Sequence, residues 1–118
     1  MDLTTASDLV PRARAIGDAL VLAVRGEVDL HNSPELRTEI LDLIEKHSPK
    51  RLVLNLTEVP YMDSSAFAVL VESLRRLRAV GGKVCLVGLQ PRVRGLLEIS
   101  RLQTIFTVAE SEEQALAR

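Results

Sequence analysis

Residues 55–70 read NLTEVPYMDSSAFAVL, and this stretch contains the end of an apolar strand, a short loop and the start of an amphipathic helix. Asp63, Ser64 and Ser65 stand where the helix begins, and their side-chain oxygens can accept hydrogen bonds from the free N–H groups there. The same N–H groups and the helix dipole favour negative charge, so a phosphate or a polar group of a partner can also bind at such a place. The stretch predicts a strand–loop–helix unit whose chemically reactive side chains lie at the junction.

The chain before this unit predicts a β-hairpin and a first helix. Leu9–Ala15 contains Pro11, which cannot donate a hydrogen bond to a neighbouring strand, so we expect an edge strand here. After a turn, the apolar run Leu20–Val24 is typical of a strand that is covered on both faces. Ser33 is a suitable N-cap for the helix that follows. We expect Glu39 to point away from the core-facing side of that helix.

Short apolar runs continue to alternate with helical patterns up to the end of the chain. In the helix after the Asp-Ser-Ser sequence, Ala66 and Leu70 belong to the expected buried stripe, and Gly81 and Gly82 end the helix. Strands separated by helices favour right-handed βαβ connections. One α/β domain over residues 1–118 therefore accounts for the chain. The further elements expected here are strands at Leu52–Leu56, Val84–Val87 and Ile105–Val108, and helices at Pro91–Ile99 and from Ser111 through Ala117.

The composition is ordinary for a soluble protein and gives no sign of a nucleic-acid-binding surface. The 118 residues include 15 Lys and Arg against 16 Asp and Glu, so the formal net charge is -1, and aromatic residues make up only 3% with no Trp. The N-terminal residues lack the basic and apolar regions of a signal peptide, and no apolar run approaches the roughly 20 residues of a membrane span. With Cys85 as its single cysteine, the chain has no intrachain disulfide. We expect a cytoplasmic protein.

Patterns of catalytic or metal-binding residues are not found in the sequence. Ser64 lacks the flanking glycines of a nucleophile elbow, because Met62 and Ala66 occupy those positions. His31 and His47 have no cysteine partners at metal-ligand spacing, and solvated loop histidines explain them better. We therefore expect a binding protein and not an enzyme, with no cofactor and no metal of its own.

The Asp-Ser-Ser sequence at residues 63–65, with four further segments in matching order, resembles the STAS domain family and more narrowly the bacterial anti-sigma factor antagonists. In that family an Asp-Ser-Ser-Gly or Asp-Ser-Thr-Gly element opens a helix after a strand and a loop. The resemblance implies an α/β fold with a mixed four- to five-stranded sheet and helices packed mainly on one face. The further segments are Gly26–Asp29 with Ser33–Leu36, Gly81–Val84, Val87–Leu89 with Pro91–Val93, and Ile105–Phe106 through Ser111–Leu116.

The same resemblance implies that Ser64 is a phosphorylation site, because the first Ser of the family element is the phosphorylated one and it aligns with Ser64. The partner in the family is an anti-sigma factor that is also an ATP-dependent serine kinase, and a serine phosphatase reverses the modification. In the family, the unmodified protein binds the anti-sigma factor and so frees a sigma factor for RNA polymerase. The phosphorylated protein releases the anti-sigma factor. We expect a monomer or weak dimer, without direct contact to nucleic acid and without membrane insertion.

Six residues are candidates for contact with such a partner. Asp29 is explained about as well by a turn-forming role, and Ser65 by capping or packing. Ala66 stands where the family usually has Gly, so its methyl group is expected at the docking surface. Phe67 is either buried or part of the interface. The full set of candidates is Asp29, Asp63, Ser64, Ser65, Ala66 and Phe67.

Two other functions also fit a STAS domain. One is an accessory subunit of a bacterial lipid-transport ABC system, in which the same surface docks on an ATPase subunit and the serine need not be phosphorylated. The other is a scaffold component of a large stress-sensing complex, in which STAS domains assemble with one another. The Asp-Ser-Ser sequence favours the kinase partner over the transporter subunit.

Overall fold

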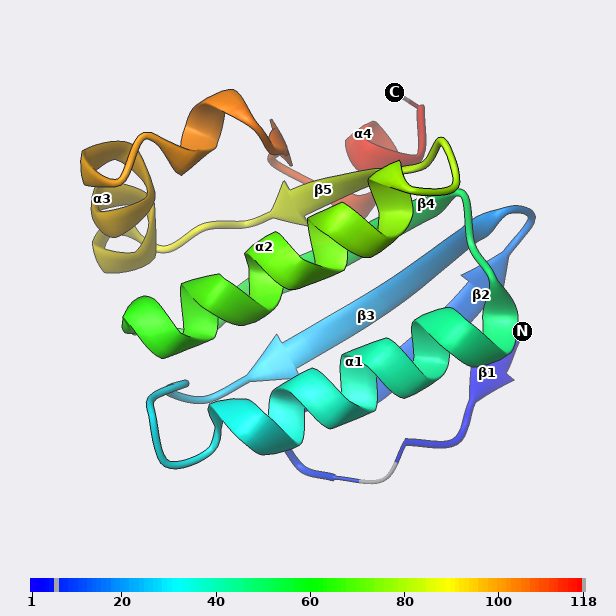
Figure 1. Ribbon diagram of the computed structural model, residues 1–118, viewed down its shortest axis with the longest axis horizontal. Coiled ribbons are helices and arrows are strands. Elements are labelled where there is room, and N and C mark those ends of the chain that lie inside the picture. The colour runs from blue at the N-terminus through cyan, green and yellow to red at the C-terminus, as the bar shows by residue number, and fades with distance from the viewer. Residues whose placement is uncertain (6, 118) are drawn as a thin grey trace.

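The apolar runs of the sequence lie in one six-stranded sheet in the computed structural model, which describes residues 1–5 and 7–117 (Figure 1). The strands are β1 (Asp2–Leu3), β2 (Arg12–Ile16), β3 (Ala19–Arg25), β4 (Arg51–Glu58), β5 (Lys83–Val87) and β6 (Thr107–Ala109). They lie side by side in chain order. The pairs from β1 to β3 are antiparallel and those from β3 to β6 are parallel. The mixed sheet is as expected, but it has six strands where four to five were expected.

The additional strand is β1, which has only two residues and pairs with β2 through Asp2 with Arg14 and Leu3 with Ala13. The prediction that β2 is an edge strand is therefore wrong. Its premise was the proline at position 11, but β2 begins one residue later at Arg12, so Pro11 interrupts none of its paired positions. The antiparallel pairing of β2 with β3 confirms the expected hairpin.

Three helices connect the parallel strands, namely α1 (Ser33–His47), α2 (Ser64–Arg78) and α3 (Pro91–Ile99), the last followed by the 3-10 turn η1 (Leu102–Thr104). Each connection leads to the next strand in the same direction, and such connections are right-handed in nearly all proteins. All three therefore lie on one face of the sheet, with α1 and α2 side by side in front of it (Figure 1). The short α4 (Glu112–Ala117) packs on the other face, against β4, β5 and β6.

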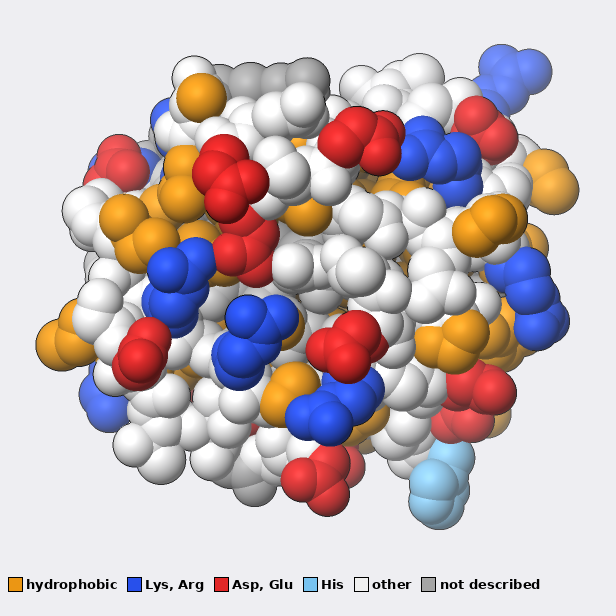
Figure 2. All heavy atoms as spheres, turned by 180° about the vertical axis from the view of Figure 1, so that it is seen from behind, with side chains coloured by type: hydrophobic (Ala, Val, Ile, Leu, Met, Phe, Trp, Pro, Cys, Tyr) orange, Lys and Arg blue, Asp and Glu red, His pale blue; other side chains and the backbone are white. Residues whose placement is uncertain are grey.

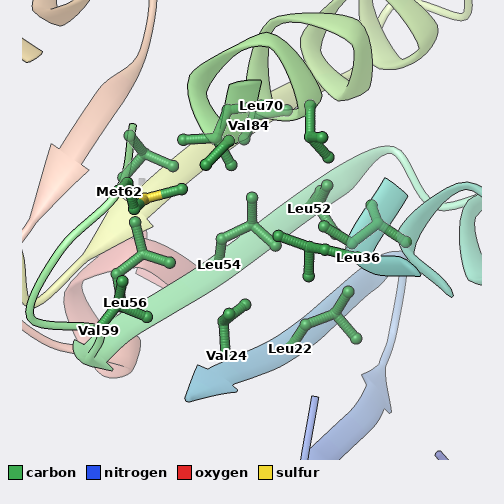
Figure 3. Packing of buried hydrophobic residues seen from close by; sticks show 14 of the residues in the cluster. Leu22, Val24, Leu36, Leu52, Leu54, Leu56, Val59, Met62, Leu70 and Val84 are labelled. Atoms are coloured by element: carbon green, nitrogen blue, oxygen red, sulfur yellow. The ribbon is translucent and has the colours of Figure 1, made fainter. Parts of the chain in front are cut away.

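The middle parts of the central strands are mostly apolar, and helices cover both faces of the sheet there. Toward α1 and α2, alternate side chains of β3 and β4 meet the apolar sides of the helices, as Leu22, Leu54, Leu36 and Leu70 illustrate (Figure 3). Each buried leucine contributes roughly 1.5–3 kcal/mol to folding. The other face carries a smaller buried cluster, which comprises Val21, Val53, Cys85, Val87, Ala109 and Ala115 of α4.

The start and one side of α1 differ from the expectation. Asn32 and not Ser33 is the N-cap residue, and Ser33 is the first residue of the helix. The Asn32 side chain makes no capping hydrogen bond and instead binds the loop before the helix. Glu39 is only 8% exposed and accepts a hydrogen bond from the Ser7 hydroxyl, so it does not point away from the protein. The N-terminal segment covers this side of the helix, which the helical spacing cannot reveal.

The face of the molecule turned away from α1 and α2 carries acidic and basic side chains in close alternation (Figure 2). Among the described side chains, neither sign of charge forms a large continuous area there. This mixture agrees with the formal net charge of -1. In the described part of the chain, no helix has both the length and the hydrophobicity to cross a membrane.

The N-terminus and the start of α2 lie at opposite ends of the sheet (Figure 1). The Met1 ammonium group donates a hydrogen bond to the carbonyl of Ala15, which pairs with Leu20 near the start of β3. In contrast, α2 follows the carboxyl end of β4, which is parallel to β3. The loops at this carboxyl end form the candidate site.

Candidate functional site

Two loops meet at the carboxyl ends of β3 and β4, which is the edge where open parallel sheets commonly bind ligands. An isolated parallel bridge joins Val28 in the first loop to Met62 in the second. The Val28 N–H donates to the carbonyl of Tyr61 at 3.0 Å, and the Asp63 N–H donates to the carbonyl of Val28 at 3.1 Å. This bridge brings Asp29 and Asp63 to the same edge of the sheet.

Asp63 is the N-cap of α2, which confirms the interpretation of its position in the sequence. Its Oδ1 accepts hydrogen bonds from the N–H groups of Ser65 at 3.0 Å and Ala66 at 3.2 Å. The same oxygen accepts a third hydrogen bond from the Ser65 hydroxyl at 2.6 Å. One carboxylate oxygen therefore satisfies two of the N–H groups that a helix start leaves free.

The second oxygen of Asp63 binds the other loop, because Oδ2 accepts the N–H of Leu30 at 2.9 Å across 33 residues of sequence. Asp63 thus holds the two loops together while it caps the helix. Its hydrogen bonds, foremost that from the Ser65 hydroxyl, lower the pKa of the carboxyl below the ordinary value, although partial burial acts in the opposite direction. Asp63 is therefore ionised at neutral pH.

Ser64 and Ser65 have different surroundings although they are neighbours. Ser65 is half-buried and its hydroxyl binds Asp63. Ser64 is the exposed first residue of α2, and its hydroxyl has no hydrogen-bond partner within residues 1–5 and 7–117. Capping accounts for Asp63 and Ser65 but leaves the Ser64 hydroxyl free to react or to bind a partner.

Asp29 forms the turn before α1, one of the two roles considered for it. Its Oδ1 accepts the N–H groups of His31 at 2.9 Å and Asn32 at 3.2 Å. In return the Asp29 N–H donates to Oδ1 of Asn32 at 2.9 Å, and the Asn32 amide donates to the carbonyl of Glu27. Because these bonds fix the loop, Asp29 orders this part of the site whether or not a partner contacts it.

The side chains of Ala66 and Phe67 lie in the core. Ala66 is 0% exposed and Phe67 is 6% exposed, and both belong to the cluster between the sheet and the helices. The prediction that Ala66 belongs to the buried stripe of α2 is therefore confirmed, and the expectation that its methyl group lies at the docking surface is wrong. The reason is helical geometry, since Ala66 stands one turn before the buried Leu70 on the same side of α2. Neither side chain offers a partner appreciable surface.

Contacts from the segment before α3 and from its first turn hold the end of β4 and the loop that leads to Asp63. Gln90 donates through Nε2 to the carbonyl of Thr57 at 2.8 Å. Gly88 has a φ of 70°, and a Cβ atom there would stand 2.2 Å from Oγ1 of Thr57, so only glycine fits. The Arg92 guanidinium lies over the ring of Tyr61 with its central carbon 4.7 Å from the ring centroid. The sequence patterns did not single out these contacts.

A second feature that the sequence patterns did not single out is Leu30, whose side chain is 76% exposed beside the site. The available signal is an apolar residue within a loop otherwise made of polar and turn-forming residues. Beside Ser65 the surface has only a shallow depression of about 200 Å³, smaller than the 300–1,000 Å³ of most ligand pockets. Among the described residues, no group of histidine, cysteine and carboxylate side chains is arranged to hold a metal ion. The site is a surface of loops and a helix end that suits a protein partner.

Comparison with known proteins shows the family. The sequence model of the STAS domain matches residues 10–115. The chain belongs to the STAS domain family. This STAS domain is 33% identical over 95 residues to the anti-sigma-B factor antagonist of Listeria monocytogenes, covering 80% of this chain and 82% of the relative. It is 30% identical over 90 residues to the anti-sigma-B factor antagonist of Bacillus subtilis, covering 76% of this chain and 81% of the relative.

Solved structures of one protein, SpoIIAA, in two chemical states resemble this one. The phosphorylated form of the Bacillus cell fate determinant SpoIIAA matches with a TM-score of 0.69 and 26% identity over 90% of this chain and 96% of that chain. SpoIIAA in its unphosphorylated form, described as an anti-sigma factor antagonist, matches with a TM-score of 0.70 and 22% identity, over 90% and 94% of the two chains. These comparisons support an anti-sigma factor antagonist over a transporter subunit or a scaffold component.

Proposed function

We propose that this STAS domain is an anti-sigma factor antagonist whose binding is switched off by phosphorylation of Ser64. The observation that carries the proposal is the exposed Ser64 hydroxyl at the first residue of α2, which has no hydrogen-bond partner among the described residues and lies next to an aspartate that already caps the helix. A kinase can reach this oxygen without opening the fold. The curated relatives, which are anti-sigma factor antagonists, add independent support.

The switch follows from the charge that phosphorylation adds. A phosphoserine carries about -1.5 to -2 charges at pH 7, and here it stands beside the ionised Asp63. Asp63 already accepts the N–H groups of Ser65 and Ala66, so a phosphate on Ser64 finds these donors occupied. The helix dipole still favours a negative charge at this end. The phosphate therefore projects from the surface, and the fold itself need not change.

A partner packed against the start of α2 experiences the full effect of that added charge. It loses the hydrogen bonds that it makes to the free Ser64 hydroxyl and faces two adjacent negative groups. Loss of such a contact together with like-charge repulsion costs several kcal/mol, which corresponds to a hundred- to thousandfold loss of affinity. Unmodified Ser64 is then the binding-competent state.

The proposed partner is an anti-sigma factor with serine kinase activity, and a serine phosphatase restores the unmodified state. The kinase supplies ATP and magnesium, so this chain acts as the phosphoryl acceptor and performs no catalysis itself. Because a sigma factor acts on RNA polymerase, we place the protein in the cytoplasm. We propose that it acts as a monomer or weak dimer.

Phosphorylation in vitro tests the modified residue. The purified chain is incubated with ATP and each anti-sigma factor kinase of the same organism, and intact mass and peptide mapping locate the phosphate. We expect one phosphate on the wild-type chain and none on Ser64→Ala. Ser65→Ala is the matched control, because it removes the adjacent hydroxyl and leaves Ser64 in place. Full labelling of Ser64→Ala would contradict the assignment.

Binding tests the switch separately. Ser64→Asp places a negative charge at the phosphorylated position, and we expect it to weaken binding of the anti-sigma factor at least tenfold. Its melting temperature should stay within about 2 °C of the wild type, because the replaced side chain is exposed and unpartnered. A large fall in melting temperature would mean that Ser64 is a structural residue.

A further inference from the structure

Leu30 combines high exposure with a backbone that hydrogen bonds hold in place. Its side chain is 76% exposed, at the end of the molecule where α2 begins. Single exposed leucines are common on protein surfaces and need no explanation by themselves. The surroundings of this leucine set it apart.

Hydrogen bonds fix the loop on both sides of Leu30. Asp29 accepts the N–H groups of His31 and Asn32, and the Asn32 side chain binds the backbone of Glu27 and Asp29. The Leu30 N–H itself donates to Asp63 at 2.9 Å. The polar groups of the loop thus fix the backbone of a residue whose apolar side chain is exposed to water. A loop backbone ordered before binding loses little further entropy when a partner binds.

The Asp63 carboxylate joins Leu30 to the switch residue. One of its oxygens binds the Leu30 N–H and the other caps the helix that begins at Ser64. We propose that Leu30 is the apolar anchor of the docking surface and inserts into an apolar pocket on the anti-sigma factor, beside the place that receives Ser64. This inference rests on the proposed function and adds to it the residue that supplies apolar binding energy, which a serine and an aspartate cannot supply.

The charges around Leu30 favour this partner over a second copy of the chain. The carboxylates of Glu27, Asp29 and Asp63 belong to the two loops at this edge, and residues 26–36 contain no lysine or arginine. In a two-fold symmetric contact each surface faces itself, so a dimer formed through Leu30 would bring these carboxylates toward their own copies. Repulsion of like charges opposes that arrangement.

The test measures binding to the purified anti-sigma factor kinase that phosphorylates Ser64. Leu30→Ala should raise the Kd at least tenfold, because burial of a leucine side chain is lost. Leu30→Met, which keeps the apolar volume, should bind nearly as the wild type does. Val80→Ala is the matched control: Val80 is 51% exposed, and it follows the end of the 15-residue α2, which separates it from Ser64 by about 22 Å. All three variants should melt as the wild type does.

The outcomes separate this inference from the proposed function. If Ser64→Asp loses affinity while Leu30→Ala binds as tightly as Val80→Ala, the anchor is refuted and the switch stands. If no anti-sigma factor kinase of the organism binds the wild-type chain or modifies Ser64, both fail. Sedimentation of the chain alone provides one more check. If the wild-type chain forms a dimer and Leu30→Ala abolishes it, Leu30 mediates contact between two copies of the chain, and the proposal is overturned.

Discussion

Replacement of Asp63 tests whether one carboxylate joins the helix start to the neighbouring loop. In Asp63→Ala the N–H groups of Ser65 and Ala66 lose their acceptor, and loss of an N-cap costs about 0.5–2 kcal/mol. The Leu30 N–H loses its acceptor as well, which costs roughly a further 1 kcal/mol for a partly exposed, charge-assisted bond. We therefore expect Asp63→Ala to lower the free energy of unfolding by about 1.5–3 kcal/mol.

Asp63→Asn separates the two contributions. Asparagine is about as good an N-cap as aspartate, so its Oδ1 can still accept from the start of α2. Its amide nitrogen, however, would face the Leu30 N–H and could not accept that hydrogen bond. We expect a loss of about 1 kcal/mol for this variant, well below that of Asp63→Ala.

Thermal and urea unfolding monitored by circular dichroism measure both variants. At roughly 2.1 cal/mol/K of unfolding entropy per residue, a chain of 118 residues shifts by about 4 °C for each kcal/mol. Asp63→Ala should then melt about 6–12 °C below the wild type and Asp63→Asn about 4 °C below it. The reasoning is refuted if Asp63→Ala melts within 2 °C of the wild type, or if the two variants are equally destabilised.

Two further predictions concern acid stability and the loop before the site. Hydrogen bonds lower the folded-state pKa of Asp63 below the ordinary 3.8, so the stability that its carboxylate contributes is fully present above about pH 5 and is lost as the pH falls through the folded-state pKa. In urea unfolding from pH 7 to pH 2, the difference in the free energy of unfolding between wild type and Asp63→Asn should therefore shrink below pH 4. A difference that stays constant over this pH range would contradict the prediction. Gly88→Ala should lower the free energy of unfolding by about 1–3 kcal/mol, because the residue has a φ of 70° and its new Cβ atom would clash with the Thr57 side chain. Adding Thr57→Ala should recover only part of this loss, and full recovery would show that backbone strain plays no role.

The sequence predicted the parts of the fold that depend on local pattern. The apolar runs of β3, β4 and β5 required cover on both faces, and the structure provides it with α1 and α2 on one side and α4 on the other. The residue types at the start of α2 indicated a cap among Asp63, Ser64 and Ser65, and the structure shows that Asp63 is the N-cap. The family resemblance narrowed the function, and the comparisons confirmed the family.

The parts that the sequence did not reveal depend on contacts between distant segments. β1 has two residues, too few for any periodicity, and it exists because β2 offers it a free edge. Asparagine and serine are both common N-cap residues, so the sequence alone does not decide between Asn32 and Ser33. The hydrogen bonds of the Asn32 side chain to the preceding loop hold it at the N-cap position. The separate roles of Ser64 and Ser65 also become visible only in three dimensions, since either hydroxyl could have bound Asp63.

The position of the N-terminus has a practical consequence. Met1 is tied to Ala15 near the start of β3, so the length of the sheet separates it from the loops that hold Leu30 and Ser64 (Figure 1). A fluorophore, affinity handle or surface tether joined to Met1 therefore leaves the proposed docking end of the molecule facing solution. Immobilised wild-type and variant chains would all present that end in the same orientation, which allows their dissociation rates to be compared directly.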